Sequence, residues 1–341
     1  MSLKNLSAKN KIPKDLQKRL SNKKINQIYK RFEKSLNIED KFAVGVSGGP
    51  DSLALAFLAK IFSVKKNIPA KFFIVNHKLR KDSTREANLV KKTLKENSIN
   101  SEILTWNGKK PNRNIQSLAR QKRYNLIFQK CDKLKINNIL LGHHQDDLME
   151  NFFLRLLRGS GLKGLISLDE RNKIGDKNLL RPLINQKKKD LEFIAKYVFN
   201  FYVNDPANID EKYQRVIIRN LIKELKKNGL DKKKFLKTIN NLKYSNEVVN
   251  FYVHKNLEDN TYLLLNKNKI MLKKEFFYQP YEIIFRAFSD SIKKIGQKYY
   301  SVRGKKLDST IQQIRNSRLS KLTLGGCIIE KVNQTVIISK E

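Results

Sequence analysis

Short apolar runs alternate with longer helix-like segments along residues 42–158, and this alternation limits the folds open to the chain. The apolar runs are FAVGV, KFFIVNH, SEILTW and NNILLGHH, and the segments of helical spacing that follow them cover residues 53–62, 83–97, 114–134 and 146–158. Strand and helix in regular alternation predict a doubly wound α/β domain, in which a parallel sheet carries helices on both faces. A strand such as FAVGV, apolar throughout, is typical of the buried centre of such a sheet.

The segments before and after this alternation have different patterns. A basic leader enters a helix near residues 23–36, and after the RPL at 181–183 helical spacing among lysines replaces the strands. TYLLLNKNKIML and the final GGCIIEKVNQTVIISKE are expected to form hairpins. We therefore expect three parts: a leader and helix at residues 1–40, the α/β domain at 41–205, and a smaller, mainly helical domain with C-terminal hairpins at 206–341.

The chain is strongly basic, with 71 Lys and Arg against 32 Asp and Glu and a formal net charge of +39. Such an excess is typical of proteins that bind a polyanion, above all nucleic acid. An AT-rich genome, which raises Lys and Asn in every protein, predicts the same composition, so charge alone leaves both explanations open. The lysine runs at residues 187–189 and 232–234 fit solvated faces.

Neither the membrane nor an oxidising compartment is indicated. No apolar run approaches the ~20 residues of a membrane span, and the first residues lack the apolar centre of a secretory signal. The two cysteines, Cys131 and Cys327, are too few for a disulfide framework or a structural zinc site. We expect a cytoplasmic protein with no membrane partner.

The most informative stretch is the loop between the first predicted strand and helix, which consists of Ser47, Gly48, Gly49, Pro50, Asp51 and Ser52. Backbone N–H groups and a helix N-terminus bind phosphate in this context. The glycines leave no Cβ between backbone and ligand, the serines add hydroxyl donors, and Asp51 can hold Mg²⁺ beside the phosphates. The Walker pattern and G-x-G-x-x-G are absent, and the alternative is an ordinary Gly-Gly-Pro turn with a Ser or Asp cap.

A second group of candidates follows the fourth predicted strand. His143 and His144 stand at its exit, where one could orient a phosphate or shuttle a proton. Asp147 and Glu150 are three residues apart and so share a helix face, where two carboxylates can hold a cationic amine. A metal site is disfavoured because the other histidines are not spaced as ligands, and a solvated helix face is the remaining alternative.

The loop resembles the SGGxDS pyrophosphate loop of the N-type ATP pyrophosphatases, the PP-loop superfamily, whose fold is adenine nucleotide alpha hydrolase-like. That resemblance implies that ATP is cleaved between its α- and β-phosphates and that a substrate oxygen is adenylated. A nucleophile then displaces AMP. The loop therefore indicates the first half-reaction and leaves the substrate open.

Further stretches resemble the tRNA isoleucine lysidine synthetases in particular. They are VNHKLRKDSTREA, LARQKRYNLI, LLGHHQDDLMENFFLRLLRGSGLKGL, RPLINQKKKDL, NDPANIDEKYQRVIIR and the closing LGGCIIEKVNQTVIISKE. The chain departs from the family pattern at Lys78 (usually Gly), Ala207 (usually Ser) and Ile217 (usually Arg). The resemblance implies a ligase that uses ATP and Mg²⁺ to join free L-lysine to C2 of the wobble cytidine in the CAU anticodon of an isoleucine tRNA. An adenylated cytidine would precede release of AMP, and codon reading would change from AUG to AUA.

Site residues follow from this resemblance together with the residue chemistry. We expect ATP to contact the six loop residues with His77 and His143, and catalysis to involve Asp51, Arg120 and Asp147. Lysine would bind Asp147 and Glu150. Arginines suit phosphate and the O2 of cytosine, so tRNA or AMP would contact Arg123, Arg215 and Arg219. Without the surrounding motifs, these arginines would be read as surface charge.

Two other functions and the oligomeric state stay open. A tRNA thiolase of the same superfamily would need a reactive cysteine, but neither cysteine lies in a C-x-x-C pair and a buried structural thiol fits each. A catalytically silent, basic RNA-binding module would turn over no ATP. A homodimer is compatible with the sequence.

Overall fold

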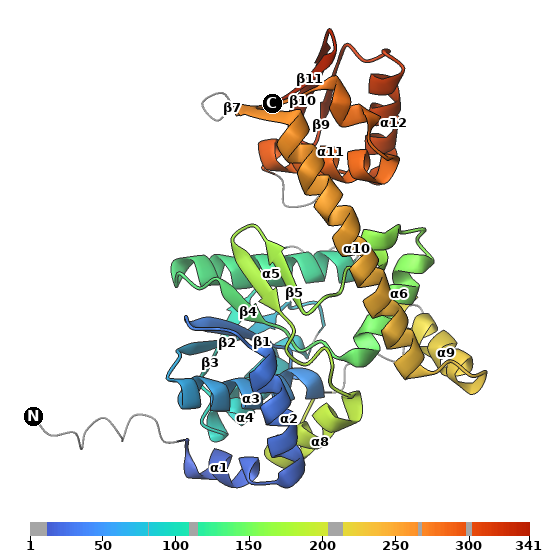
Figure 1. Ribbon diagram of the computed structural model, residues 1–341. Coiled ribbons are helices and arrows are strands. Elements are labelled where there is room, and N and C mark those ends of the chain that lie inside the picture. The colour runs from blue at the N-terminus through green and yellow to red at the C-terminus, as the bar shows by residue number, and fades with distance from the viewer. Residues whose placement is uncertain (1–11, 81, 109–114, 204–213, 265–267, 298–301) are drawn as a thin grey trace, which may run out of the picture. The chain divides into compact units, whose positions relative to one another are not determined.

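The computed structural model describes residues 12–80, 82–108, 115–203, 214–264, 268–297 and 302–341. The chain forms two compact units, residues 1–229 and 230–341, and Figure 1 labels most of their helices and strands. Each unit has its own hydrophobic core.

The first unit is built on a six-stranded sheet in the order β3-β2-β1-β4-β6-β5. Its strands are β1 (Phe42–Val46), β2 (Ala70–Asn76), β3 (Ser101–Thr105), β4 (Asn138–Leu140), β5 (Arg171–Ile174) and β6 (Lys177–Leu180). All pairs are parallel except β5 with β6. The predicted doubly wound sheet is confirmed. The β5–β6 hairpin was not expected, because the edge strand RNKI is polar and gives no apolar run.

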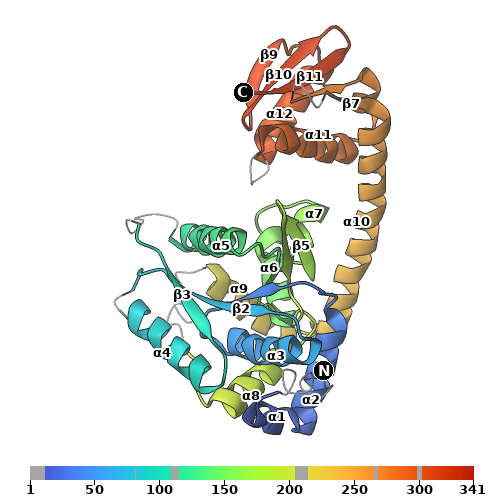
Figure 2. The same cartoon turned by 90° about the vertical axis from the view of Figure 1, so that its left-hand side faces the viewer.

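Helices cover both faces of this sheet, as Figure 2 shows for α5 on one face and α3, α4 and α8 on the other. The helices of the unit are α1 (Lys14–Leu20), α2 (Lys23–Ser35), α3 (Pro50–Lys66), α4 (Ser83–Glu96), α5 (Ile115–Lys133), α6 (Gln145–Leu156), α7 (Leu162–Leu165), α8 (Lys188–Phe199) and α9 (Gln214–Lys227). Alternate β1 residues serve the two cores: Phe42 and Val44 pack with α3, whereas Ala43 packs with α5. This double burial explains why the central strands are apolar throughout.

The second unit combines helices with a five-stranded antiparallel sheet in the order β7-β8-β11-β10-β9. Its elements are α10 (Lys232–Asn260), β7 (Thr261–Leu264), β8 (Lys269–Leu272), the 3₁₀ helix η4 (Lys274–Tyr278), α11 (Tyr281–Gly296), α12 (Gly304–Arg315), β9 (Lys321–Leu324), β10 (Cys327–Val332) and β11 (Thr335–Lys340). Both predicted hairpins are present, as β7–β8 and β10–β11. Asn333, with φ of 53°, adopts the left-handed conformation in the second turn.

The compact units divide at residues 229 and 230, later than the boundary predicted between 205 and 206. Helix α9 packs on α6, so it belongs to the first unit. The predicted boundary itself falls in residues 204–213, outside the described part of the chain. At the other end, α1 and α2 belong to the first unit too, because Leu16, Ile28 and Phe32 are buried in its core. No helix in the described residues is long and apolar enough to cross a membrane.

Candidate active site

The polar residues of the site lie at the carboxyl ends of the parallel strands, along one edge of the sheet. The loop at residues 47–52 follows β1, His77 follows β2, the histidine pair follows β4 and Arg181 follows β6. The chain proceeds from β1 to β2 on one side, while β4 lies on the other side of β1. The gap between β1 and β4 is therefore the topological switch point at which open α/β sheets bind ligands.

The loop after β1 is shaped by its own hydrogen bonds. The Ser52 hydroxyl accepts from the Ser47 backbone N–H at 3.1 Å and donates to the Gly49 carbonyl at 2.9 Å. Gly48 has φ of +87°, and a Cβ at this position would lie 2.6 Å from Cγ2 of Val90. Only glycine fits there. Gly49 is the N-cap of α3 and has no side chain to accept from the first-turn N–H groups, which leaves that helix end suited to an anion.

His144 joins two carboxylates at the switch point. Its Nε2 lies 3.5 Å from Asp51 Oδ2 and 3.7 Å from Asp147 Oδ2. Its Nδ1 accepts from the Asp146 backbone N–H at 3.1 Å, so the proton of the neutral ring is on Nε2 and faces the carboxylates. Burial lowers the pKa of His144, but the hydrogen bond to Asp51 and the charge of Asp147 outweigh it and raise the pKa overall.

Asp51 fits the magnesium ligand that the loop predicts. Its Oδ1 is buried and has no hydrogen-bond partner among the described residues. Mg²⁺ binds through one or two carboxylates together with phosphate oxygens and water. No group of three or more His, Cys, Asp or Glu side chains that could hold a metal occurs in the described part of the chain. A magnesium ion at Asp51 would thus need oxygens from a bound triphosphate.

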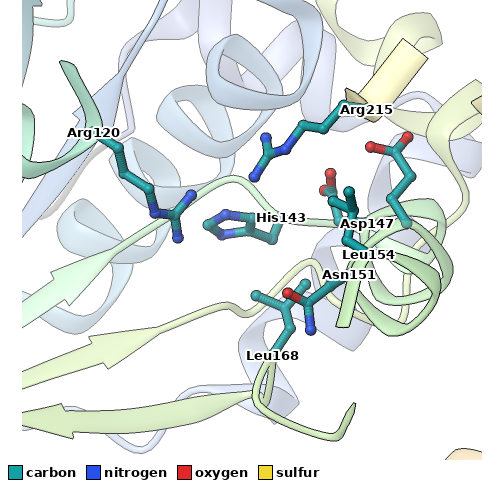
Figure 3. Close-up of a pocket in the computed structure, with 8 residues that line it drawn as sticks. Arg120, His143, Asp147, Asn151, Leu154, Leu168 and Arg215 are labelled. Carbon is teal, nitrogen blue, oxygen red and sulfur yellow. The ribbon is translucent and has the colours of Figure 1, made fainter. Parts of the chain in front are cut away.

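A small pocket of about 30 Å³ opens beside His143. It is lined by Arg120 from α5, by Arg215 from α9, by Asp147, Glu150, Asn151 and Leu154 from α6, and by His143 and Leu168. In Figure 3 the guanidinium groups of Arg120 and Arg215 extend toward His143, while Asp147 and Asn151 project from α6. The pocket therefore has a cationic half and a carboxylate half. Its volume suits the head of a side chain rather than a whole nucleotide.

The cationic half favours an anion. Burial and the charges of Arg181 and Arg120 lower the pKa of His143 well below its usual value, so the ring is neutral. Its buried Nδ1 has no partner among the described residues. Partial burial and the charge of Arg120 also lower the pKa of Arg215. Two arginines that repel one another beside a neutral histidine form a site that a negative group would stabilise.

Glu150 and Arg219 were predicted to bind different ligands, but they form an ion pair with each other. Arg219 Nε donates to Glu150 Oε1 at 2.6 Å, and Glu150 is 7% exposed. Burial raises the pKa of Glu150, and the hydrogen bond from Arg219 opposes the rise. Asp147 is consequently the pocket carboxylate not held by an arginine in this part of the structure.

The remaining predicted pair, His77 and Arg123, lies at the end of β2. Arg123 Nε donates to His77 Nε2 at 3.3 Å. Burial and the Arg123 charge lower the pKa of His77 to about 4, so this ring is neutral. Its Nδ1 is buried without a partner in the described residues, which leaves it able to bind a ligand group.

Both cysteines are remote from this chemistry. Cys131 and Cys327 are each 0% exposed, in the cores of the two units. Burial raises the pKa of Cys131 to about 12, and the Cys327 thiol donates to the Ile292 carbonyl. Neither is an activated thiolate.

Two contributors were not assigned a role from the sequence, and the histidine pair that includes His144 was expected only to orient a phosphate or shuttle a proton. The bridge made by His144 depends on a helix cap that spacing alone does not reveal. Arg181 is visible in the sequence only as the charge that follows β6, yet it is buried beside His143 and donates to the Asp169 carbonyl at 2.7 Å. Val203 donates its backbone N–H to the Gly48 carbonyl at 2.9 Å, and no sequence signal indicates this contact.

Comparison with known proteins agrees with this geometry. Residues 17–225 match the family model described as a PP-loop domain. The chain is 33% identical over 309 residues to the tRNA(Ile)-lysidine synthase of Wolbachia pipientis wMel, an alignment that covers 89% of this chain and 71% of that protein. The corresponding enzyme of Rickettsia bellii (strain OSU 85-389) is 30% identical over 326 residues, covering 92% and 74%.

Among solved structures, the U34-tRNA thiolase NcsA from Methanococcus maripaludis, determined with its 4Fe-4S cluster, is similar to the chain. The TM-score is 0.56 at 18% identity, and the match covers 64% of this chain and 78% of the thiolase. At that level of identity the likeness supports the fold alone.

Proposed function

Because this chain belongs to the tRNA(Ile)-lysidine synthase family of ATP-dependent, tRNA-modifying ligases, we propose that it joins free L-lysine to C2 of the wobble cytidine in the CAU anticodon of an isoleucine tRNA. The observation that carries the proposal is the meeting of three features at one switch point. A phosphate loop that requires glycine, the Asp51 carboxylate with its Oδ1 unpartnered in the described residues, and a pocket with a cationic and a carboxylate half all adjoin the pair His143 and His144.

In the first half-reaction, the O2 atom of the cytidine attacks the α-phosphorus of ATP, and the bond to the β-phosphate breaks with loss of pyrophosphate. The first turn of α3 and the Ser47 hydroxyl would bind the departing pyrophosphate, while the buried Ser52 hydroxyl holds the loop in shape through its bonds to Ser47 and Gly49. Magnesium at Asp51 would neutralise part of its charge. His144 would hold Asp51 in position through its Nε2–H.

In the second half-reaction, the ε-amine of lysine attacks C2 of the cytidine, the C2–O2 bond breaks, and AMP leaves with that oxygen. The attacking amine loses a proton, which Asp147 would accept because the other pocket carboxylate, Glu150, is paired with Arg219. Arg120 and Arg215 would stabilise the growing negative charge on the leaving phosphate. His77, whose Nδ1 is unpartnered in the described residues, would contact ATP. The proposed location is the cytoplasm, where tRNA, ATP and lysine occur together.

The test is an assay of AMP and pyrophosphate formation with single omissions. The complete mixture should release AMP and incorporate labelled lysine into tRNA, whereas omission of lysine or of isoleucine tRNA should abolish lysine incorporation. A methionine tRNA with the same anticodon should not be modified. Absence of AMP release with every component present would favour the silent RNA-binding module, and incorporation of sulfur in place of lysine would favour a thiolase.

A further inference from the structure

Two arginines at the end of α6 have no part in the proposed chemistry. Arg155 is in the last turn of the helix, and Arg158 follows directly after its C-cap, Leu157. Both side chains are exposed. No carboxylate pairs with either one among the described residues, and Arg158 donates only to the neutral Gln214 Oε1, at 3.0 Å. Their charges are therefore not compensated locally.

The helical repeat aligns these arginines with the pocket. Asp147, Asn151 and Arg155 are spaced four residues apart on α6, so they follow one face of the helix. Asp147 and Asn151 line the pocket, and Arg158 extends the same stripe beyond the end of the helix. An extended ligand whose end occupies the pocket would meet Arg155 next and Arg158 after it.

The stripe is electrostatically continuous with Arg120. Partial burial and the charges of Arg158 and Arg120 lower the pKa of Arg155. Arg120 in turn lowers the pKa of Arg215 across the pocket. Four arginines thus form a series that runs from the pocket onto the surface, and each like-charge contact in it is unfavourable without an anion.

The backbone after α6 leaves room beside this series. Gly159 lies in the turn after the C-cap of α6, with φ of +65°, and the Ser160 N–H donates to the Arg155 carbonyl at 3.0 Å, which fixes the turn. A Cβ placed on Gly159 would meet no atom within 4 Å. The surface here is open rather than packed.

We propose that Arg155 and Arg158 bind consecutive backbone phosphates of the RNA strand whose target base lies at the mouth of the pocket lined by Arg120 and Asp147. The proposal rests on the proposed function for the identity of the RNA. Arginines that recur along one helix face away from a pocket fit a polynucleotide, because its charges recur along a chain, whereas free ATP presents its charge in one triphosphate group.

The competing explanation is structural. Arginines in the last turn of a helix interact favourably with the helix dipole. A dipole role predicts a loss of thermal stability when the charges are removed and no change in RNA binding. A phosphate-binding role predicts weaker RNA binding and little change in thermal stability.

The experiment measures tRNA affinity of the full chain against salt concentration, without ATP or lysine. Combined Arg155→Gln and Arg158→Gln should flatten the slope of log K against log salt by about 1.5, since each phosphate contact contributes roughly 0.7–0.9. Arg155→Lys with Arg158→Lys should retain the wild-type slope, because a lysine still neutralises a phosphate. Arg171→Gln with Lys173→Gln, which removes two exposed charges from β5, is the matched control and should leave the slope unchanged.

An unchanged slope in the glutamine variant, or an equal loss in the β5 control, would overturn the proposal. Under steady-state turnover the glutamine variant should raise the KM for tRNA and leave the KM for lysine as in the wild type. Because binding is read without catalysis, the result does not depend on ligation. A wild-type chain that binds tRNA with the expected slope but never incorporates lysine would refute the proposed function and not this contact.

Discussion

The two units treat buried polar groups in opposite ways. In the first unit, Asp51, His77 and His143 each have a buried polar atom without a partner among the described residues, all at the carboxyl edge of the parallel sheet. In the second, Ser291, Thr310 and Cys327 are buried and donate to backbone carbonyls of their own unit. An unmet buried polar group costs about 1–3 kcal/mol, so its persistence at one edge indicates a place that a ligand completes. In the described residues of the second unit, only Arg286 Nη2 is buried without a hydrogen bond, and it lies 2.7 Å from the Glu282 carboxylate, so the second unit shows no comparable cluster.

The largest effect on this contrast is expected when the Asp51 carboxylate is removed, because its buried Oδ1 has no hydrogen-bond partner in the described residues. Asp51→Ala should reduce AMP formation by about 10²- to 10³-fold, because the charge that holds magnesium against the departing pyrophosphate is lost. Radiolabelled ATP hydrolysed in the presence of tRNA and lysine measures the effect. The exposed Asp40→Ala is the control and should retain full rate. Wild-type AMP formation by the Asp51 variant would end the assignment of the loop.

A smaller effect is expected when the pocket carboxylate Asp147 is neutralised. Asp147→Asn should raise the KM for lysine roughly 10- to 100-fold, as expected for loss of one charge-assisted hydrogen bond. The asparagine oxygen can still accept the His144 backbone N–H that Asp147 accepts at 2.8 Å, so the helix cap survives. Initial rates at varied lysine give the KM, and tRNA affinity in the same variant is the internal reference. A weakened tRNA complex with an unchanged lysine KM would show that this carboxylate serves another purpose.

The loss of a single methyl group from the core of the second unit should lower the stability of that unit and leave the ligation reaction unchanged. Ile284→Val, at a fully buried position of α11, should destabilise that unit by about 1 kcal/mol. Calorimetry should show its transition lowered by about 4–8 °C. The counterpart Ile61→Val, fully buried in α3, should lower the other transition instead. Equal displacement of both transitions by either variant would mean that the units unfold together.

The smallest effect is expected at the cysteines. Cys131→Ala combined with Cys327→Ala should leave lysine incorporation unchanged, because both thiols are buried and neither adjoins the pocket. The same assay with labelled lysine reports it. Loss of activity with an intact fold by circular dichroism would revive the thiolase alternative.

Local patterns in the sequence determined most of the architecture. The run FAVGV, the glycines before Pro50 and the hairpin turn near Asn333 each act within a few residues, so spacing and turn chemistry predict them. Because they too depend only on residues close in the sequence, the loop at residues 47–52 and the shared helix face of Asp147 and Glu150 could be predicted. The β5–β6 hairpin escaped notice because an edge strand is half exposed and needs no apolar run.

Only the tertiary structure decided which of these residues meet. Glu150 and Arg219 are 69 positions apart, and their ion pair depends on the packing of α9 against α6. The bridge from His144 to Asp51 depends on β1 and β4 being neighbours, which is a matter of strand order. Residue types and local spacing indicate which chemical groups a side chain offers and which helix face or strand end it occupies. Its pKa, its partner and its access to a ligand are set by groups brought near from distant parts of the chain, because charge interactions and desolvation act through space.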